Sequence, residues 1–291
     1  MSAGGRGGGG RGWRPAGALG LLLGLVLGGL ALLAGLARWP VTGAAPFPRE
    51  VTFRAADGVA VYGDLWAVRG RGVPLVLLFH QTQSNRAEYA TVGPRLARAG
   101  CAALAIDQRV GGTMFGRENR TGRALYPDVA YEQAWPDLEG ALRWARRRDP
   151  GGPVIVWGSS YSASLALRLA ARHPREVAAV LAFSPGEYVA RDRSLTLRAA
   201  AGVHVPLLIA AMRGHEEAQA RRLLAASPSE RRRLYVSGTP LVHGALMLRS
   251  DVNTPQGARA AWAAVAAFLS PYCPGLSGGG SAPTGSAAPP R

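Results

Sequence analysis

The sequence predicts an α/β protein built on a doubly wound, mostly parallel sheet of eight strands. Between Val51 and Tyr272, short apolar runs alternate with segments whose apolar residues recur at helical spacing, a pattern typical of a sheet with helices on both faces. The chain has 291 residues, of which 48% are hydrophobic, and is therefore long enough to bury a large core. We expect one folded domain over residues 51–273.

The domain is expected to open with a hairpin, because two apolar runs flank Asp57-Gly58, a dipeptide that favours tight turns. Six further apolar runs are expected as strands, and five periodic segments between them as helices. The expected strands are 51–54, 59–67, 73–79, 101–106, 154–157, 177–183, 206–211 and 233–236. The expected helices are 87–99, 131–148, 162–172, 216–226 and 254–269.

The first 50 residues form a separate part of the chain. Residues 1–15 are rich in glycine and arginine, and residues 16–36 carry no charge over a length that suits a bilayer-spanning helix better than a cleaved signal peptide. We expect this N-terminal hydrophobic helix to be a signal anchor that places the domain outside the cytoplasm, because more arginines precede than follow it. Secretion after signal cleavage is the alternative, since small residues follow at 42–45. Residues 37–50 are expected to be a linker.

The remaining composition indicates an arginine-rich but otherwise ordinary globular protein. The net charge is +16 and all 34 basic residues are arginine, but the clusters at 146–148 and 231–233 lack the interleaved aromatic side chains that stack on bases, so no nucleic-acid partner is expected. An exported domain would permit a disulfide between Cys101 and Cys273, although Cys101 is interpreted first as a small apolar residue in a buried strand. Residues 274–291 are expected to be a disordered tail.

One motif carries most of the chemical information. The sequence from Trp157 to Ser162 ends a predicted strand and leads directly into a predicted helix. A strand that turns at once into a helix through small-x-Ser-x-small holds the central serine at the apex of a strained turn, with its hydroxyl above the sheet. Gly158 and Ser162 are the small residues that let the two backbones approach. The pattern predicts that Ser160 is a nucleophile; the alternative is a serine that caps an ordinary helix.

A serine nucleophile needs a histidine that accepts its proton and a carboxylate that orients the histidine. His243 fits best among the five histidines, because it follows the last predicted strand and the partners of such an elbow follow in the order serine, acid, histidine. The acid is expected just after strand 206–211, where Glu216 is favoured over Glu217 because it is nearer to the strand. Glu187, after the preceding strand, is the fallback.

The developing oxyanion of an acyl transfer needs backbone N–H donors. The residue directly after the nucleophile, Tyr161, is the first expected donor. Gln81, in the loop after strand 73–79, is the second.

Four motifs in this order resemble the α/β-hydrolase superfamily, in the neighbourhood of its dienelactone-hydrolase-like and serine-aminopeptidase-like members. They are Phe79-His80-Gln81, the run Asp107–Gly112, the run Gly158–Ser162 and His243-Gly244. The resemblance covers about residues 51–272 and implies the α/β-hydrolase fold, a Ser-acid-His triad, and hydrolysis of an ester, thioester or amide without a metal or organic cofactor. The partner is then a small-molecule or acyl substrate.

Three further expectations accompany this resemblance. Only residues 186–205 are available where relatives insert a lid, so little or no lid is expected. Asp107 and Arg109 are expected to form a structural ion pair, and the arginines of the loop 108–128 to favour an anionic acyl group. The alternative function is a catalytically inert, membrane-anchored binding module that keeps the hydrolase scaffold.

Overall fold

The computed structural model describes residues 47–123, 130–188 and 192–276. In these ranges no helix is both long enough and apolar enough to cross a lipid bilayer. The expected hydrophobic helix at 16–36 lies outside them, as do residues 1–15 and most of the expected linker and tail. The first strand begins at Arg49, inside the expected linker, and a short 3-10 turn, η4 (Pro274–Leu276), follows the last helix.

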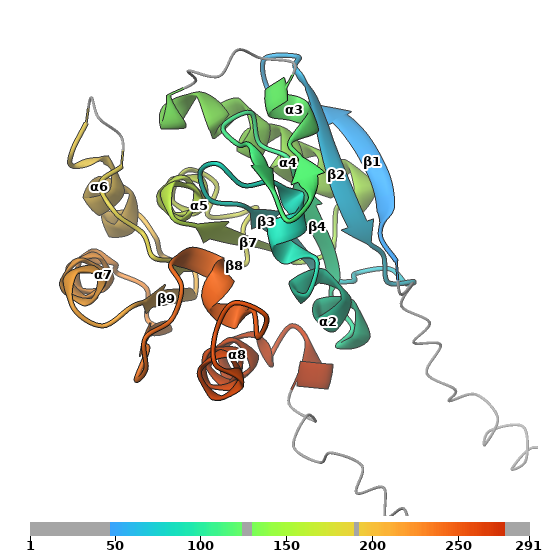
Figure 1. Ribbon diagram of the computed structural model, residues 1–291. Helices are drawn as coiled ribbons and strands as arrows, with labels where there is room; N and C mark the ends of the chain where they lie inside the picture. The colour runs from blue at the N-terminus through green and yellow to red at the C-terminus, as the bar shows by residue number, and fades with distance from the viewer. Residues whose placement is uncertain (1–46, 124–129, 189–191, 277–291) are drawn as a thin grey trace, which may run out of the picture. The chain divides into compact units, whose positions relative to one another are not determined.

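Eight strands form one sheet in the order β1-β2-β4-β3-β7-β8-β9-β10 (Figure 1). The pairs β1–β2 and β2–β4 are antiparallel and the other five pairs are parallel, as predicted. The strands are β1 (Arg49–Arg54), β2 (Ala60–Trp66), β3 (Leu75–Phe79), β4 (Ala102–Ile106), β7 (Val154–Ser159), β8 (Ala179–Phe183), β9 (Leu207–Ala211) and β10 (Arg232–Val236).

Helices cover both faces of this sheet. They are α2 (Val92–Arg98), α3 (Arg120–Arg123), α4 (Trp135–Arg148), α5 (Tyr161–Arg172), α6 (Leu195–Ala201), α7 (His215–Ala226) and α8 (Pro255–Leu269). Alternate strand residues point to opposite faces. Leu77 of β3 therefore packs in an apolar cluster with α4, α5, α6 and α7, whereas Leu78 packs in a second cluster with α2 and α8. The prediction that helices cover both faces of the sheet is confirmed.

The helix expected at 87–99 is divided. A 3-10 turn, η1 (Arg86–Tyr89), precedes α2, and Asn85 caps it by accepting the Ala87 N–H. Pro94 has no N–H to donate and is tolerated only in the first turn of a helix. The chain therefore starts a new helix at Val92 instead of continuing the first turn.

The elements that the sequence did not predict are short. They are α3, α6, the two-stranded ribbon of β5 (Thr113–Met114) and β6 (Arg117–Glu118), and the 3-10 turn η3 (Gly244–Leu248). The helix expected at 131–148 is present as a 3-10 turn, η2 (Tyr131–Ala134), followed directly by α4. Within the described ranges, α6 is the only helix between β8 and β9. This agrees with the expectation of little or no lid.

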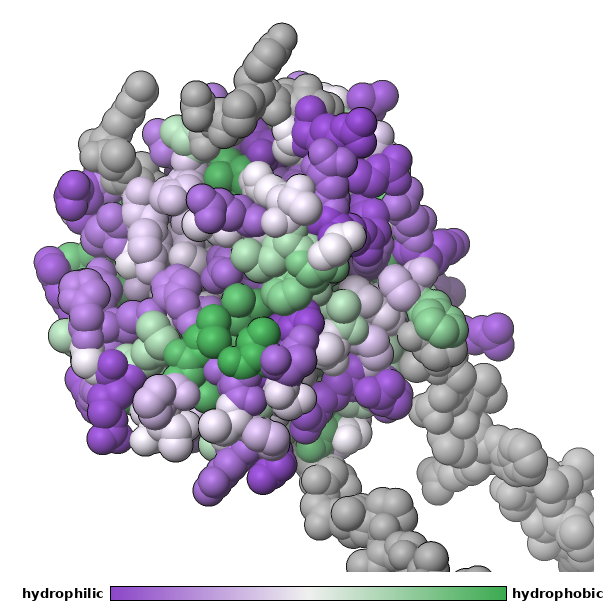
Figure 2. Space-filling view, in the orientation of Figure 1, coloured by the Kyte–Doolittle hydropathy of each residue, from purple (hydrophilic) through white to green (hydrophobic). Residues whose placement is uncertain are grey.

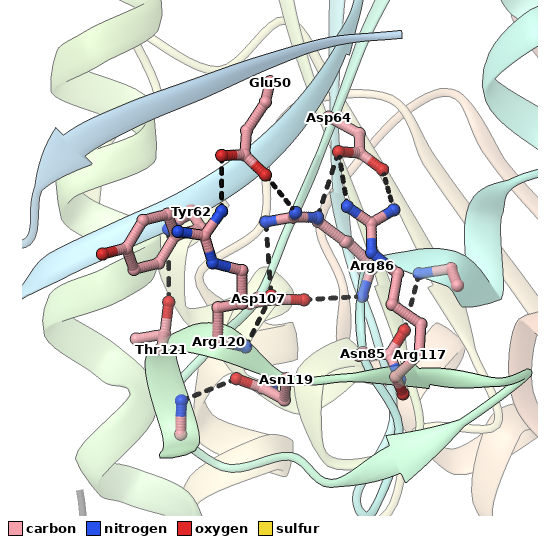
Figure 3. Close-up of polar contacts among 12 residues, drawn as sticks. Glu50, Tyr62, Asp64, Asn85, Arg86, Asp107, Arg117, Asn119, Arg120 and Thr121 are labelled. Carbon is pink, nitrogen blue, oxygen red and sulfur yellow. Dashed lines mark hydrogen bonds and ion pairs between the residues drawn. The ribbon is translucent and has the colours of Figure 1, made fainter. Parts of the chain in front are cut away.

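A buried arginine of η1 binds carboxylates from β1, β2 and the end of β4 (Figure 3). The Arg86 side chain is 1% exposed and forms ion pairs with Glu50, Asp64 and Asp107 at 2.6, 3.0 and 3.3 Å. Asp107 also accepts the backbone N–H groups of Arg86 and Arg120. Because a buried charge is stable only when it is paired and hydrogen-bonded, this cluster holds η1, β2 and the end of β4 together.

The expected ion pair between Asp107 and Arg109 is wrong. Arg109 instead pairs with the buried Asp137 of α4 at 2.8 Å and with Asp57 of the first hairpin at 2.7 Å. The carboxylate of Asp107 is already occupied by Arg86 and by backbone donors. The arginines that follow in the loop, Arg117, Arg120 and Arg123, are also ion-paired, with Asp64, Glu50 and Glu118 respectively.

Cys101 and Cys273 form a disulfide. Both side chains are fully buried, so Cys101 is the small buried residue that the sequence indicated, but its sulfur is bonded, not free. The bridge joins the start of β4 to the residues after α8, and the backbone adds a hydrogen bond from Gly275 to Ala99 at the same place. The C-terminal end of the domain is therefore fastened to the start of β4.

We predict that replacing both cysteines with alanine lowers the free energy of unfolding by about 2–5 kcal/mol. The bridge spans 172 residues of sequence, and a cross-link over a long loop removes much of the entropy of the unfolded chain. Urea unfolding of both proteins, with and without a reductant, measures this. The reductant should destabilise the wild type and leave the double variant unchanged, and two titratable thiols in unreduced, denatured wild type would disprove the pairing.

Candidate active site

Ser160 occupies the apex of the turn between β7 and α5. Its backbone angles are φ 59° and ψ −124°, a conformation that non-glycine residues rarely adopt. A Cβ atom on Gly158 would lie 2.5 Å from the Ala163 nitrogen and closer still to the Ser162 carbonyl oxygen. The turn is therefore possible only with glycine at 158, which is the steric requirement that the motif predicted.

Ser162 stands where this motif usually has its second glycine, and its side chain has a structural role. The Ser162 hydroxyl donates to the His80 carbonyl over 2.6 Å and accepts from the Gln108 side chain. The ring of His80 is fully buried, and burial lowers its pKa. The Gln108 N–H donates to His80 Nε2 at 3.0 Å, so the neutral ring lies in a closed network. His80 therefore fastens the loop after β3 to the elbow.

The imidazole of His243 is paired with Glu216. His243 Nδ1 lies 2.6 Å from Glu216 Oε1, and the other carboxylate oxygen accepts from the Met212 N–H at 2.9 Å and the Ser184 hydroxyl at 2.7 Å. Burial raises the pKa of Glu216, but these three hydrogen bonds outweigh it and hold the pKa below its usual value. Because an ionised carboxylate only accepts hydrogen bonds, Nδ1 carries a proton, and in the neutral imidazole the lone pair is then on Nε2.

The other two glutamates considered from the sequence lie elsewhere. Glu217 pairs with Arg221 one turn along α7, at 2.7 Å. The Glu187 carboxylate accepts the N–H groups of Thr196 and Leu197, each at 2.9 Å, and so caps the first turn of α6. Of the three, only Glu216 is hydrogen-bonded to His243.

The loop that carries His243 is fastened to the elbow. The Ala245 N–H donates to the Ser159 hydroxyl over 2.8 Å, and a Cβ atom on Gly244 would overlap that same oxygen. The hydroxyl of Ser160 and the imidazole of His243 are both in the described part of the chain and are not hydrogen-bonded to each other. Such bonds are often long before substrate binds and shorten in the complex.

The two expected oxyanion donors differ in their surroundings. Among the described residues, no acceptor is bonded to the N–H of Tyr161, which begins α5 at the elbow. The Gln81 N–H, in contrast, donates to Oε2 of Glu88 at 3.1 Å. Glu88 is fully buried in η1, and burial raises the pKa of its carboxyl group. The Gln81 N–H is therefore engaged in this structure, whereas that of Tyr161 is available.

The surface around His243 is apolar. Figure 2 shows a hydrophobic area over the orange segment of Figure 1 that connects β10 with α8. Val242 and Val252 are 36% and 41% exposed there. They line a shallow hollow of about 660 Å³ that also includes Leu241 and Thr254. The hollow thus lies between the residues directly before His243 and residues 251–254, and Asp251 and Asn253 add polar groups to it.

Sequence reasoning missed three residues that shape this site. Ser184 bonds to Glu216, Glu88 holds Gln81, and Tyr188 donates its hydroxyl to the Ser184 carbonyl at 3.0 Å. Ser184 directly follows a buried strand, so the rule that polar residues at strand ends form sites had already indicated its position. Glu88 lies in an expected helix and gave no such signal. Within the described ranges, no group of three or more histidine, cysteine or acidic residues is arranged to hold a metal ion.

Comparison with known proteins gives one family match and several structures with the same fold. Residues 72–273 match the family model described as serine aminopeptidase, S33. A dienelactone hydrolase from Anabaena variabilis has a similar structure, with a TM-score of 0.58 and 22% identity over 78% of this chain and 99% of its own. An esterase from Pyrococcus furiosus has a TM-score of 0.58 and 19% identity, over 81% of this chain and 97% of its own. A protein described as a putative dienelactone hydrolase from Klebsiella pneumoniae has a TM-score of 0.56 and 15% identity, over 77% of this chain and 100% of its own. No curated protein sequence matches the chain.

We predict that Gly158→Ala lowers the free energy of unfolding by about 3 kcal/mol, at the upper end of the usual cost of overpacking, because the new methyl group meets backbone atoms that cannot move aside. Gly238→Ala is the matched control, since a Cβ atom there meets nothing within 4 Å. Urea unfolding of both variants measures the difference. Equal stability of the two proteins would show that the elbow is not as tight as described.

Proposed function

Because the chain belongs to the serine aminopeptidase-like family of the α/β-hydrolase superfamily, we propose that it is a serine hydrolase that acts on an ester, thioester or amide. We assign Ser160 as the nucleophile, His243 as the general base and Glu216 as the acid of the triad. The observation that carries this proposal is the pairing of a left-handed Ser160 at the elbow with a His243–Glu216 hydrogen bond of 2.6 Å.

The proposed reaction has two halves. In the first, His243 Nε2 accepts the proton of the Ser160 hydroxyl while the oxygen attacks the substrate carbonyl, and then gives the proton to the departing alcohol, thiol or amine. In the second, the same imidazole activates a water molecule that releases the acyl group from Ser160. Glu216 stays ionised throughout and stabilises the imidazolium that forms in each half.

We propose the Tyr161 N–H as the first oxyanion donor, because it begins a helix next to the nucleophile and has no acceptor among the described residues. The second donor is proposed to come from the loop after β3. Gln81 fills this role only if its N–H leaves Glu88 when substrate binds.

A substrate with an uncharged acyl group is favoured over an anionic one. The hollow formed by residues 240–242 and 251–254 contains the apolar side chains of Leu241, Val242 and Val252 and no basic residue, whereas the arginines expected to attract an anion are ion-paired. The test compares the rates of hydrolysis of three kinds of substrate: short-chain p-nitrophenyl esters, a p-nitrophenyl succinate monoester and aminoacyl amides. The uncharged esters should be hydrolysed faster than the anionic succinate. Faster turnover of the succinate would contradict this preference.

For the location of the protein, we propose a domain outside the cytoplasm, held by residues 16–36 as a signal anchor, with secretion after cleavage as the alternative. The uncharged run and the disulfide support this location, because disulfides persist in oxidising compartments. Protease treatment of intact cells tests it, since an exported domain is digested without lysis.

A fluorophosphonate probe separates the proposed enzyme from an inert binding module on the same scaffold. A reactive serine becomes covalently labelled, and the label should disappear in Ser160→Ala. Ser227→Ala removes a buried serine at the start of the segment before β10 and should keep the label. A folded wild type that takes no label would favour the binding module.

We predict that Ser160→Ala and His243→Ala each reduce turnover on the best ester by a factor on the order of 10⁴–10⁶, and that the double variant is scarcely slower than either. The losses do not add, because the hydroxyl attacks only when the imidazole accepts its proton. Steady-state kinetics with folded proteins measures this. If Ser160→Ala keeps more than about a tenth of the wild-type turnover, Ser160 is not the nucleophile.

We predict that Glu216→Gln reduces turnover by a factor on the order of 10³–10⁴, because the amide still fits but no longer carries the charge that stabilises imidazolium. Glu217→Gln and Glu187→Gln are matched controls with the same chemical change, and each should stay within about threefold of the wild type, since their carboxylates bond elsewhere. A larger loss in either control than in Glu216→Gln would reassign the acid.

A further inference from the structure

Ser184 has an unusual backbone for its residue type. It directly follows β8, is fully buried, and has a φ of 51°, in the left-handed region that favours glycine. Its N–H donates to the Ala210 carbonyl of the neighbouring strand over 2.7 Å. A buried non-glycine residue keeps such a conformation only where the surrounding structure holds it.

The Ser184 hydroxyl links two parts of the proposed triad. It donates to Oε2 of Glu216 at 2.7 Å and accepts the N–H of Gly244 at 3.0 Å. Gly244 is the residue directly after His243, so one oxygen atom joins the carboxylate to the loop that carries its imidazole partner. The hydroxyl is thereby satisfied both as a donor and as an acceptor.

The backbone carbonyl of Ser184 binds a further side chain. It accepts the hydroxyl of Tyr188 at 3.0 Å. Burial raises the pKa of Tyr188. Ser184 therefore contacts the acid, the histidine loop and Tyr188 from one position.

We propose that Ser184 is a positioning residue of the hydrolase. Its hydroxyl holds Glu216 and the His243 loop at the relative position that the 2.6 Å contact between Glu216 Oε1 and His243 Nδ1 requires. The role in turnover rests on the function proposed above, whereas the effect on the Glu216–His243 contact does not. The hydroxyl acts through Glu216 and His243 and needs no contact with substrate.

The test compares Ser184→Ala with Ser184→Gly in the full-length chain. Both remove the hydroxyl, but glycine adopts the left-handed backbone without strain, so it remains informative if the alanine variant folds poorly. Ser227→Ala is the matched control. Ser227 is also buried. Its hydroxyl donates to the Val203 carbonyl and accepts the N–H of Ser229.

Two readouts are needed. The first is kinetic: both Ser184 variants should lose about 10–100-fold in kcat with KM within about threefold of the wild type, the fold-change expected from one hydrogen bond to a charged group. The second is the NMR signal of the His243 Nδ1 proton, assigned by its absence in His243→Ala. It should move or broaden in both Ser184 variants and stay unchanged in Ser227→Ala.

The outcomes are distinct. Wild-type kcat together with an unchanged proton signal in Ser184→Gly would overturn the proposal, as would a loss in Ser184→Ala that glycine restores, because the backbone and not the hydroxyl would then be responsible. A shifted proton signal in a protein that hydrolyses none of the substrates would leave the positioning of His243 supported and the proposed hydrolase function refuted.

Discussion

A single backbone contact, Gly158 against Ser162 and Ala163, sets the geometry on which the site depends. It allows β7 to become α5 within one residue, and the strained residue at that point is Ser160. A left-handed residue with a side chain costs roughly 1–2 kcal/mol, so it persists only where its surroundings leave no alternative. All six residues of β7 are buried and the strand lies between β3 and β8. The strained residue therefore follows a strand that is fully buried and paired on both sides.

Short serine side chains connect the loops around this point. Ser159 binds the loop after β10, Ser162 binds the loop after β3, and Ser184 binds both α7 and the loop after β10. A serine loses little rotational freedom when it is fixed, and its short reach sets the spacing of the two chains that it joins. The loops are thus arranged by direct bonds to one another as well as by the sheet beneath them, which suits a site that must be formed before its ligand arrives.

The sequence predicted the strands and the long helices because their apolar residues repeat regularly. The apolar run at β3 and the periodic segments at α4 and α8 indicated both type and place. Short elements carried no such repeat: α6 depends on the Glu187 cap, and the β5–β6 ribbon on the Asn85 side chain, which donates to the carbonyls of Met114 and Arg117. These bonds join residues that are 9 positions apart for α6 and about 30 apart for the ribbon, beyond the spacing of a helix or strand repeat, so local patterns do not reveal them.

For the candidate site, the sequence indicated the loops but not every partner. Glu216 and Glu217 are neighbours that point about 100° apart on a helix, so the direction of the first turn decides which one meets His243. That direction is set by Gly214, whose φ of 97° is open to glycine but rarely to other residues. The prediction that Asp107 pairs with Arg109 is wrong for a similar reason. The partner of Asp107 is Arg86, which is further from it in the sequence but is brought within 3.3 Å of it by the fold.

The bridge between Cys101 and Cys273 also determines what a cut in the chain would do. Residues 160, 216 and 243 all lie between the two cysteines, so they belong to one covalently closed ring of protein. A protease that cleaves one peptide bond inside the ring leaves both pieces attached, and the pieces separate only after reduction. A cut between Gln81 and Cys101 behaves differently, because it leaves the strand that precedes Gln81 attached only by non-covalent contacts. The disulfide thus keeps the fragments together after a cut in one part of the domain and not after a cut in the other.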